Sequence, residues 1–260
     1  LTGVVMFNAP KERHVSVVEA TRPVKRGDIY DRNGVLLASS IITSSLYADA
    51  ARVIEPEDAA QKLVGIFSDL GYDEVLKKLT SKKRFVWIKR NLTPRQQAEA
   101  NALGIPGVSF QSEYKRIYPE GNLVSHILGY VDTDGKGIAG VEKYFEEDLK
   151  QGKSITLALD IRVQHFAHKE TSEAVGKFKA IGGSAVVLDV NNGEVIASVS
   201  LPDFDPNMPN KSPQINMFNR NTSGVYEMGS TFKVFTTAAA LELAGVRLND
   251  FFDARKPLKY

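Results

Sequence analysis

A change near residue 150 in the length of the predicted secondary-structure elements constrains the fold of this chain more than any other feature. Up to that point, short apolar segments alternate with turns rich in Gly, Pro and Asn, whereas a strand, a long helix and a strand hairpin follow it. A run of short elements followed by longer ones is typical of an α+β protein whose parts have separate cores. We therefore expect two domains, residues 1–150 and residues 151–260, in a chain of 260 residues that is long enough to bury both.

The first half is expected to consist of short strands and helices. Arg32-Asn33-Gly34 lies between apolar segments, which is typical of a tight β-hairpin. Thr93, with Pro94 after it and Gln96 three residues on, has the composition of a capping box that opens a helix. The other elements expected here are a helix from Pro56 that ends before Gly71, strands over 85–88 and 108–118, and a short helix over 141–149.

The second half is expected to begin with a strand over residues 155–159, after which Asp160 caps a long helix. The next two strands, over 184–190 and 194–200, are expected to pair around Asn191-Asn192-Gly193. The buried stripe of the long helix is expected to consist of Val163, Phe166, Ala167, Ala174, Val175 and Phe178.

Two further segments follow this hairpin. Residues 201–216 are rich in Pro and Asn and have no hydrophobic period, which predicts a long surface loop. Residues 230–244 are apolar, rich in Ala and Leu, and end at Gly245. This composition predicts a buried helix with a glycine C-cap.

Ser230 and Lys233, at the start of this predicted buried helix, are the candidate catalytic residues. Gly229 before the serine allows a tight entry into the helix, and the unpaired N–H groups of a helix N-terminus favour a developing oxyanion. Lys233 lies three residues on, on the same helix face. A lysine that is neutral, through desolvation or a second cation nearby, would accept the serine proton. The pattern indicates a serine nucleophile with a lysine general base, without histidine or metal.

The Ser-x-x-Lys pattern is weak by itself. A second copy, Ser112 to Lys115, lies in a predicted strand, where positions three apart point to opposite faces. The alternative for Ser230 is a plain helix cap followed by a solvated lysine. A capping serine usually precedes an amphipathic surface helix, whereas residues 234–243 are nearly all apolar. Because a solvated charge does not suit a buried element, this context favours the catalytic interpretation.

Composition argues against several other classes of protein. With 33 Lys and Arg against 31 Asp and Glu, the chain gives no reason to expect nucleic acid as a partner. The absence of Cys excludes disulfides, thiolate catalysis and zinc sites that contain Cys. Of the four His residues, only His165 and His168 have a metal-like spacing, and neither Cys nor a third ligand is nearby. No metal and no other cofactor is therefore expected.

The segment around Ser230 resembles the first active-site motif of the class B penicillin-binding proteins, because Ser230-Thr-Phe-Lys233 follows Glu-x-Gly. Other motifs of this family occur in the right order along nearly the whole chain. Within the family, residues 81–90 and 93–97 are similar to the alphaproteobacterial branch of the division-specific FtsI type. The remaining matches are Arg26 to Ala38, Arg116 to Pro119, His126 to Val131, Gly140-Val-Glu142, Gly183 to Ala197 and Pro202 to Asn207.

This resemblance implies a non-catalytic pedestal domain of the dimerisation type, followed by the first part of a transpeptidase domain with a serine β-lactamase-like fold. It implies a peptidoglycan D,D-transpeptidase of septal cell-wall synthesis, in which Ser230, deprotonated by Lys233, forms an acyl-enzyme with a stem peptide. The implied partners are peptidoglycan stem peptides and their lipid-linked precursor, β-lactam antibiotics, and divisome membrane proteins that include a glycosyltransferase of the FtsW type. The implied location is the bacterial inner membrane, through a single N-terminal anchor, with the catalytic region in the periplasm.

The chain also departs from the family pattern. Met228 stands where the family usually has Pro, and the linker Gln151 to Ser154 is shorter than usual. The Ser-x-Asn and Lys-Thr-Gly motifs, which relay protons and bind the substrate carboxylate in the family, do not occur before Tyr260. We therefore expect a fragment that lacks the anchor and the rest of the transpeptidase domain and is inactive by itself.

Three alternatives to a septal transpeptidase remain. The first is an elongation-type paralogue of the same family. The second is another serine acyltransferase or hydrolase, such as a β-lactamase, although β-lactamases lack the pedestal motifs. The third is a non-catalytic scaffold or binding fragment of the divisome in which Ser230 is chemically idle.

Overall fold

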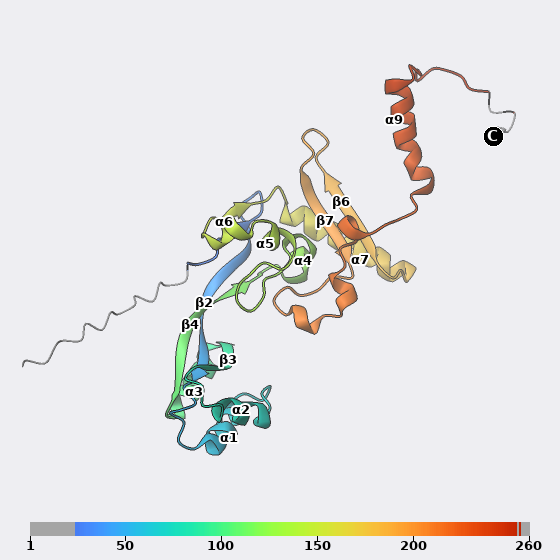
Figure 1. Ribbon diagram of the computed structural model, residues 1–260. Coiled ribbons are helices and arrows are strands. Elements are labelled where there is room, and N and C mark those ends of the chain that lie inside the picture. The colour runs from blue at the N-terminus through green and yellow to red at the C-terminus, as the bar shows by residue number, and fades with distance from the viewer. Residues whose placement is uncertain (1–23, 254, 256–260) are drawn as a thin grey trace, which may run out of the picture.

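Residues 24–253 and 255, which the computed structural model describes, form a mixed α and β structure (Figure 1). The α+β class predicted from the sequence is therefore confirmed. His14 lies outside the described residues. No helix within the described part of the chain is long and apolar enough to cross a membrane.

The long strand β2 (Leu36–Ala48) organises the first part of the structure (Figure 1). Its start pairs antiparallel with β1 (Ile29–Tyr30), and its far end pairs antiparallel with β3 (Val86–Leu92). Strand β4 (Val108–Ile117) pairs with it from Ser39 to Ala48, which confirms the predicted strand over 108–118. Strand β5 (Ile155–Thr156) pairs in parallel with β1, so residues just beyond 150 belong to the first sheet.

The turn between β1 and β2 forms because Asp31 and Gly34 suit it. The carboxylate of Asp31 accepts hydrogen bonds from the N–H groups of Asn33 and Val35, both at 2.8 Å. Gly34 adopts a φ of +81°, which side chains disfavour. The predicted hairpin is therefore confirmed. Asp31 is fully buried and also accepts from the N–H of Ile161 at 3.2 Å, so this turn is joined to a segment 130 residues further along.

Three helices cover one face of β2 and β3. They are α1 (Pro56–Ile66), α2 (Tyr72–Leu79) and α3 (Pro94–Ala102). The predicted helix from Pro56 is confirmed, and so is the capping box of Thr93 and Gln96. Helix α2 was not predicted, although Val75 and Leu79, four residues apart, form its buried stripe. The core between helices and sheet contains Leu46, Ala48, Leu63, Phe67, Val75, Leu79, Ile88 and Leu92.

The helix expected over 141–149 is two short helices, α5 (Gly140–Tyr144) and α6 (Glu146–Lys150), separated at Phe145. Helix α4 (Ser125–Leu128) packs closely against them, because Gly129 has no side chain. A Cβ atom on Gly129 would lie 2.0 Å from the carbonyl oxygen of Ala139. These helices enclose a second core with Ile29, Leu37, Tyr118, Val124, Leu128, Leu149 and Leu159.

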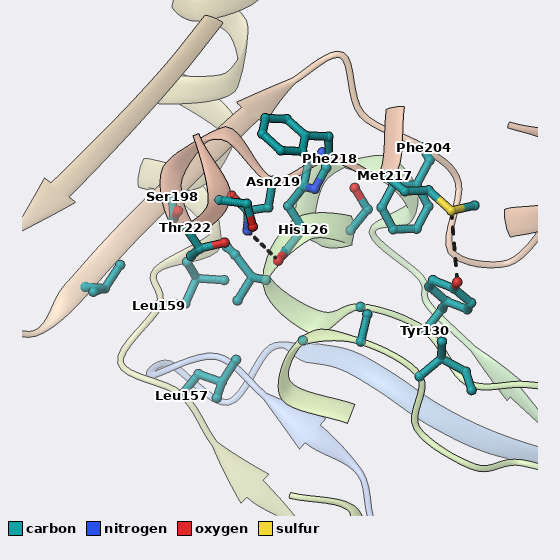
Figure 2. A pocket seen from close by; sticks show the side chains of 18 of the residues that line it. His126, Tyr130, Leu157, Leu159, Ser198, Phe204, Met217, Phe218, Asn219 and Thr222 are labelled. Carbon is teal, nitrogen blue, oxygen red and sulfur yellow. Dashed lines mark hydrogen bonds between the residues drawn. The ribbon is translucent and has the colours of Figure 1, made fainter. Parts of the chain in front are cut away.

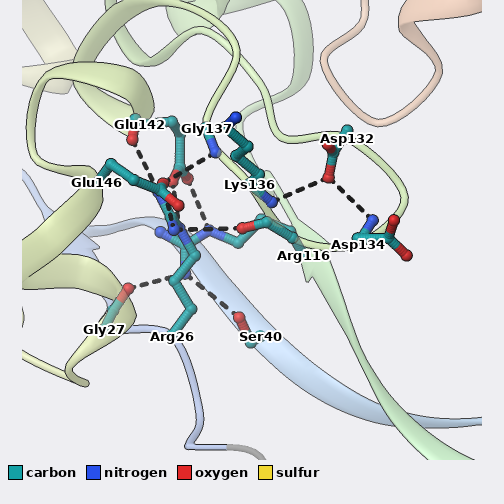
Figure 3. Close-up of polar contacts among 11 residues, drawn as sticks. Arg26, Gly27, Ser40, Arg116, Asp132, Asp134, Lys136, Gly137, Glu142 and Glu146 are labelled. Atoms are coloured by element: carbon teal, nitrogen blue, oxygen red, sulfur yellow. Dashed lines mark hydrogen bonds and ion pairs between the residues drawn. The ribbon is translucent and has the colours of Figure 1, made fainter.

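A buried carboxylate ties three distant segments to this second core (Figure 3). Glu142 is fully buried and accepts from the Nε of Arg26 at 2.7 Å and the Nε of Arg116 at 2.6 Å. Arg26 also pairs with Glu146 at 2.7 Å, and Arg116 donates to the carbonyl of Gly27 at 2.8 Å. Buried charges are tolerated only when they are paired and hydrogen-bonded, so the three segments must be placed together.

Helix α7 (Ile161–Phe178) packs on a two-stranded sheet of β6 (Gly183–Leu188) and β7 (Val195–Leu201). Asp160 caps the helix by accepting from the N–H of Arg162 at 3.0 Å. The predicted cap and the predicted hairpin are therefore both confirmed.

The predicted buried stripe of α7 is wrong at Phe166, Ala174 and Phe178, which are exposed. The helix is buried at Ile161 and Gln164 instead. The side chain of Gln164 donates to the carbonyls of Leu123 and Ser198 and accepts from the N–H of Ser198, at 2.8–2.9 Å. A periodic pattern cannot identify this inward glutamine, because the backbone groups that it satisfies come from other elements.

Replacing Glu142 with Ala is expected to destabilise the protein strongly. Two guanidinium groups would stay buried without their carboxylate, a situation that typically costs about 3–5 kcal/mol. The free energy of unfolding from urea titrations followed by circular dichroism measures this effect. Glu147→Ala, which removes an exposed carboxylate of α6, is the matched control. Equal stability of the two variants would contradict a structural role for the cluster.

Replacing Asp31 with Ala is expected to lower stability by about 3 kcal/mol, because buried N–H groups lose their acceptor. Burial opposes ionisation of Asp31, but the N–H groups of Val35, Ile161 and Asn33 outweigh it and hold its pKa below the ordinary value. The contribution of a carboxyl with a lowered pKa is complete above the unfolded-state pKa of about 3.9 and is lost as the pH falls through the folded-state pKa.

The melting temperature of wild type and variant, measured from neutral pH down to acid pH, checks both parts of this prediction. The difference between the two proteins should shrink below about pH 4. Asp189→Ala is the control, because Asp189 accepts the same kind of turn hydrogen bond at 2.9 Å but is only half-buried. A difference that stays constant with pH would contradict the assignment.

Candidate active site

Ser230 and Lys233 lie at the junction of two helical segments. Ser230 is in the 3₁₀ turn η4 (Gly229–Phe232), and Lys233 is the first residue of helix α9 (Lys233–Leu243). Gly229 enters the turn with a φ of +54°. The first N–H groups of a helix have no acceptor within the helix, so this turn presents donors beside the serine hydroxyl. Gly245, at a φ of +68°, follows the helix as predicted.

The expected burial of α9 is wrong. None of its residues is buried, and Val234 and Phe235 are 69% and 67% exposed. Figure 1 shows the helix projecting away from the strands and helices that precede it. Among the described residues, no hydrogen bond joins Ser230 to Lys233, and both side chains are exposed. A helix as rich in apolar residues as α9 needs a cover, and the described part of the chain does not provide it.

The segment that leads to Ser230 is fixed by asparagine side chains. The Nδ2 of Asn221 donates to the Oγ of Ser198 at 2.9 Å and to the carbonyl of Val199 at 2.8 Å. The Nδ2 of Asn219 donates to the carbonyl of His126 at 3.2 Å. These bonds fasten the short helix α8 (Arg220–Ser223) to β7 and to α4. Neither asparagine was predicted from the sequence. The only signal for them is that asparagines cluster in a segment that has no hydrophobic periodicity.

Asn207 joins the loop over 201–216 to the first part of the structure. Its side chain accepts from the N–H of Tyr118 at 2.9 Å and donates to the carbonyl of Tyr118 at 3.0 Å. One amide thus pairs with both backbone groups of a residue, as a neighbouring strand would. Asp205 fixes the orientation of the amide by accepting from its Nδ2 at 3.0 Å. The loop contains only short 3₁₀ turns, which confirms its predicted irregularity, but Phe204 and Pro206 are buried, so it does not lie wholly on the surface.

A cavity of about 790 Å³ is lined mainly by α4, by residues 157–159 and by residues from 217–223 (Figure 2). Phe204 forms part of its wall and contacts His126 and Tyr130 edge-on, with ring centroids 5.4 and 5.8 Å apart. Burial lowers the pKa of His126, although the carbonyl of Pro202, 3.2 Å from its Nε2, favours the protonated form. Ser230 and Lys233 are not among the residues that line the cavity. This cavity is therefore separate from the predicted catalytic pair.

His165 and His168, the histidines with a metal-like spacing, do not face a common site. The Nε2 of His168 lies 2.6 Å from the carboxylate of Asp203, which also accepts from Asn122 at 3.1 Å. His165 is exposed. Within the described residues, no group of three potential metal ligands is found.

Two family models match the chain. The penicillin-binding protein dimerisation domain matches residues 21–160, and the penicillin-binding protein transpeptidase domain matches residues 183–257. The chain therefore belongs to the penicillin-binding proteins, and within them to class B, whose members include FtsI and PenA.

Individual relatives agree with this family. The chain is 36% identical over 279 residues to a probable peptidoglycan D,D-transpeptidase PenA of Neisseria meningitidis, covering 95% of the chain and 48% of the relative. It is 34% identical over 239 residues to a probable peptidoglycan D,D-transpeptidase FtsI of Caulobacter vibrioides, covering 90% and 40%. The chain thus spans about half the length of these curated relatives, or less.

A solved structure has the same fold. The crystal structure of a peptidoglycan synthetase from Bifidobacterium adolescentis superposes with a TM-score of 0.60 at 25% identity. The likeness covers 88% of this chain and 52% of that one. The fold of most of this chain is therefore shared with part of a solved protein.

Replacing Asn207 with Ala is expected to loosen the connection between the loop and Tyr118. The variant loses two hydrogen bonds to a nearly buried backbone, which together contribute about 1–3 kcal/mol. Hydrogen exchange of the Tyr118 amide, followed by mass spectrometry or NMR, should become at least about tenfold faster. Asn210→Ala, at an exposed position of the same loop, is the control. Unchanged exchange at Tyr118 would show that Asn207 does not hold the loop.

Proposed function

We propose that the intact protein is a peptidoglycan D,D-transpeptidase that forms an acyl-enzyme on Ser230. The observation that supports this most directly is the position of Ser230 at the N-terminus of an apolar helix, within the segment that matches the transpeptidase family model. Lys233 lies one turn on, in the position of a general base. The names of the relatives give the reaction class and the polymer.

In the proposed mechanism, Lys233 takes the hydroxyl proton as the Oγ of Ser230 attacks the carbonyl of the penultimate D-Ala of a stem peptide. The terminal D-Ala leaves with a proton, and an ester to Ser230 remains. The amino group of a neighbouring stem then attacks this ester, forms the cross-link and restores the hydroxyl. The N–H of Ser230 would stabilise the oxyanion, and one such donor is typically worth about 2.7–4 kcal/mol. No cofactor is required.

Lys233 must lose its proton to act as a base, which requires desolvation or a neighbouring cation. In the described structure its helix is exposed. We propose that further chain of the intact protein covers α9 and supplies this environment, because the curated relatives are about twice as long or more. The 260-residue chain by itself is then inactive.

The cellular role is part of the same proposal. A septal function is supported by the likeness to a protein named FtsI. The proposal also includes a single N-terminal membrane anchor and a periplasmic catalytic region, which the family resemblance implies. The proposed partners are stem peptides and their lipid-linked precursor, β-lactams, and divisome proteins with an FtsW-type glycosyltransferase. We propose a pedestal domain followed by part of a transpeptidase domain, with the boundary near residue 150. The pairing of β5 with β1 and the family match to residue 160 favour a boundary some ten residues later.

A second candidate is a non-catalytic scaffold of the divisome. The exposure of α9 and the absence of a hydrogen bond between Ser230 and Lys233 in the described structure favour it. The two functions differ in one property, because only the transpeptidase reacts covalently with a β-lactam.

Ser230→Ala in the full-length protein is expected to abolish covalent labelling by penicillin. Intact-mass spectrometry should detect one adduct on wild type and none on this variant. Lys233→Ala should acylate at least about a hundredfold more slowly, since general-base catalysis contributes at least that much. The controls are Ser112→Ala and Lys115→Ala, which alter the second Ser-x-x-Lys pattern of the chain and should leave labelling intact. An adduct that persists in Ser230→Ala, or a folded wild type that never acylates, would contradict the proposal.

A further inference from the structure

An open sheet face with three aromatic side chains lies at the far end of the first domain. The rings of Tyr47 and Phe85 stack with centroids 4.7 Å apart, and Trp87 meets Phe85 edge-on at 4.8 Å and Tyr47 at 6.3 Å. Phe85 is 46% exposed, and the other two are half-buried. We call these three residues the aromatic platform.

The alternation of strand β2 explains why the platform is open. Leu46 and Ala48 point into the core beneath the helices α1–α3, so Tyr47 between them points to the opposite face. Its direct neighbours on β4 and β3 are Ser109 and Trp87. Ser109 is exposed, so the neighbour of Tyr47 on β4 leaves this side of the sheet open.

Arg90 holds the platform in place from one side. Its guanidinium lies over the Trp87 ring, 5.2 Å from the centroid. The same guanidinium binds both carboxylate oxygens of Glu113, at 2.6 and 3.0 Å, and Asp134 at 2.7 Å. The contacts with Arg90 and with the other rings restrict the indole of Trp87 before any ligand binds. Binding therefore costs little side-chain conformational entropy, so the platform is pre-organised.

Three cations immediately precede the platform residue Phe85 in the chain. Lys82, Lys83 and Arg84 form the turn that enters β3, and all are exposed. None of them forms an ion pair with another residue that the structure describes, unlike Lys78 and Lys89 nearby. The carbonyl of Lys83 accepts from the N–H of Ala50 at 2.9 Å, which ties this turn to the end of β2. Three cations without an ion-pair partner among the described residues therefore directly precede Phe85 in the chain.

We propose that the aromatic platform and the Lys82–Arg84 turn bind an uncross-linked peptidoglycan glycan strand that carries its stem peptides. Sugar rings present flat C–H faces that stack on aromatic rings, and the stem peptides carry carboxylates that complement the unpaired cations. The polar Ser109 beside the rings suits sugar hydroxyls and does not suit acyl chains of a lipid surface. The choice of polymer rests on the proposed function, whereas the binding site does not include Ser230 or Lys233.

Binding of fluorescently labelled glycan strands, released from peptidoglycan by an endopeptidase, tests this site by anisotropy with the 260-residue chain. Trp87→Ala and Phe85→Ala are each expected to weaken binding at least about tenfold, as expected for central aromatic contacts. Tyr144→Ala, which removes an aromatic that is 83% exposed on α5, should have no effect. Circular dichroism confirms that each variant is folded.

A second probe separates the two halves of the site. Strands whose stem peptides have been removed by an amidase keep the sugar rings but lose most carboxylates. The double variant Lys82→Ala/Lys83→Ala should weaken binding of the complete strands severalfold and leave the stripped strands unaffected, whereas Lys143→Ala on α5 should change neither.

Several results would overturn the proposal. They are absence of binding to either strand, equal affinity of Trp87→Ala and wild type, and equal or tighter binding of polyglutamate or of vesicles that contain phosphatidylglycerol. Equal affinity of Trp87→Ala, or equal binding of polyglutamate or of the vesicles, would mean that the cations attract any anion without help from the rings. Penicillin labelling of full-length Trp87→Ala, which should match wild type, distinguishes failure of this site from failure of the transpeptidase proposal.

Discussion

Glu142 is buried together with two guanidinium groups, and three segments that are distant in sequence meet at this cluster. Arg26 precedes β1, Arg116 lies near the end of β4, and Glu142 is in α5. An ion-pair cluster of this kind adds little net stability compared with a well-packed apolar core, but it penalises any arrangement that leaves one charge unpaired. Its main effect is therefore to exclude alternative packings of three segments that are far apart in sequence.

Side-chain amides perform a similar task further along the chain. Asn207, Asn221 and Gln164 each bond to backbone groups of another element, in places where no strand is available to pair with them. An amide can donate and accept at once, so it satisfies an N–H and a C=O together. The contacts of Asn207 and Asn221 fix the loop over 201–216 and the segment that precedes Ser230, whereas Gln164 joins α7 to Leu123 and β7. Irregular backbone is thus held in a defined position without regular secondary structure.

Local signals in the sequence predicted most of the elements, and contacts between elements account for the errors. The Asn33-Gly34 turn, the Thr93 capping box and the Asp160 cap each depend on a few neighbouring residues, and the structure contains all three. The stripe of α7 was misassigned because its burial depends on β7. The hydrophobic pattern of a helix predicts that one of its faces is buried, but it does not identify the element that packs against that face.

The same limit applies to the candidate site. The type and spacing of Ser230 and Lys233 could be recognised from sequence, because the pattern is local. The environment that would make the lysine a base is not local, and the exposure of Val234 and Phe235 shows that the described residues do not create it. Asn219 and Asn221, which fix the approach to the serine, belong to no periodic pattern and could not be assigned before their acceptors on β7 and α4 were known.

The length of the proposed substrate gives a reason for binding residues far from the nucleophile. Figure 1 places the helices α1–α3 and helix α9 at opposite ends of the structure. A polymer held at the aromatic platform would keep its other stem peptides at a raised effective concentration around Ser230, provided that the strand spans the distance. This benefit requires a rigid connection, since free motion of the aromatic platform relative to Ser230 would spread the strand over a larger volume. The buried Glu142 cluster and the Asn207 contact are the interactions that would restrict such motion, so interactions that specify the fold would also set the geometry of substrate delivery.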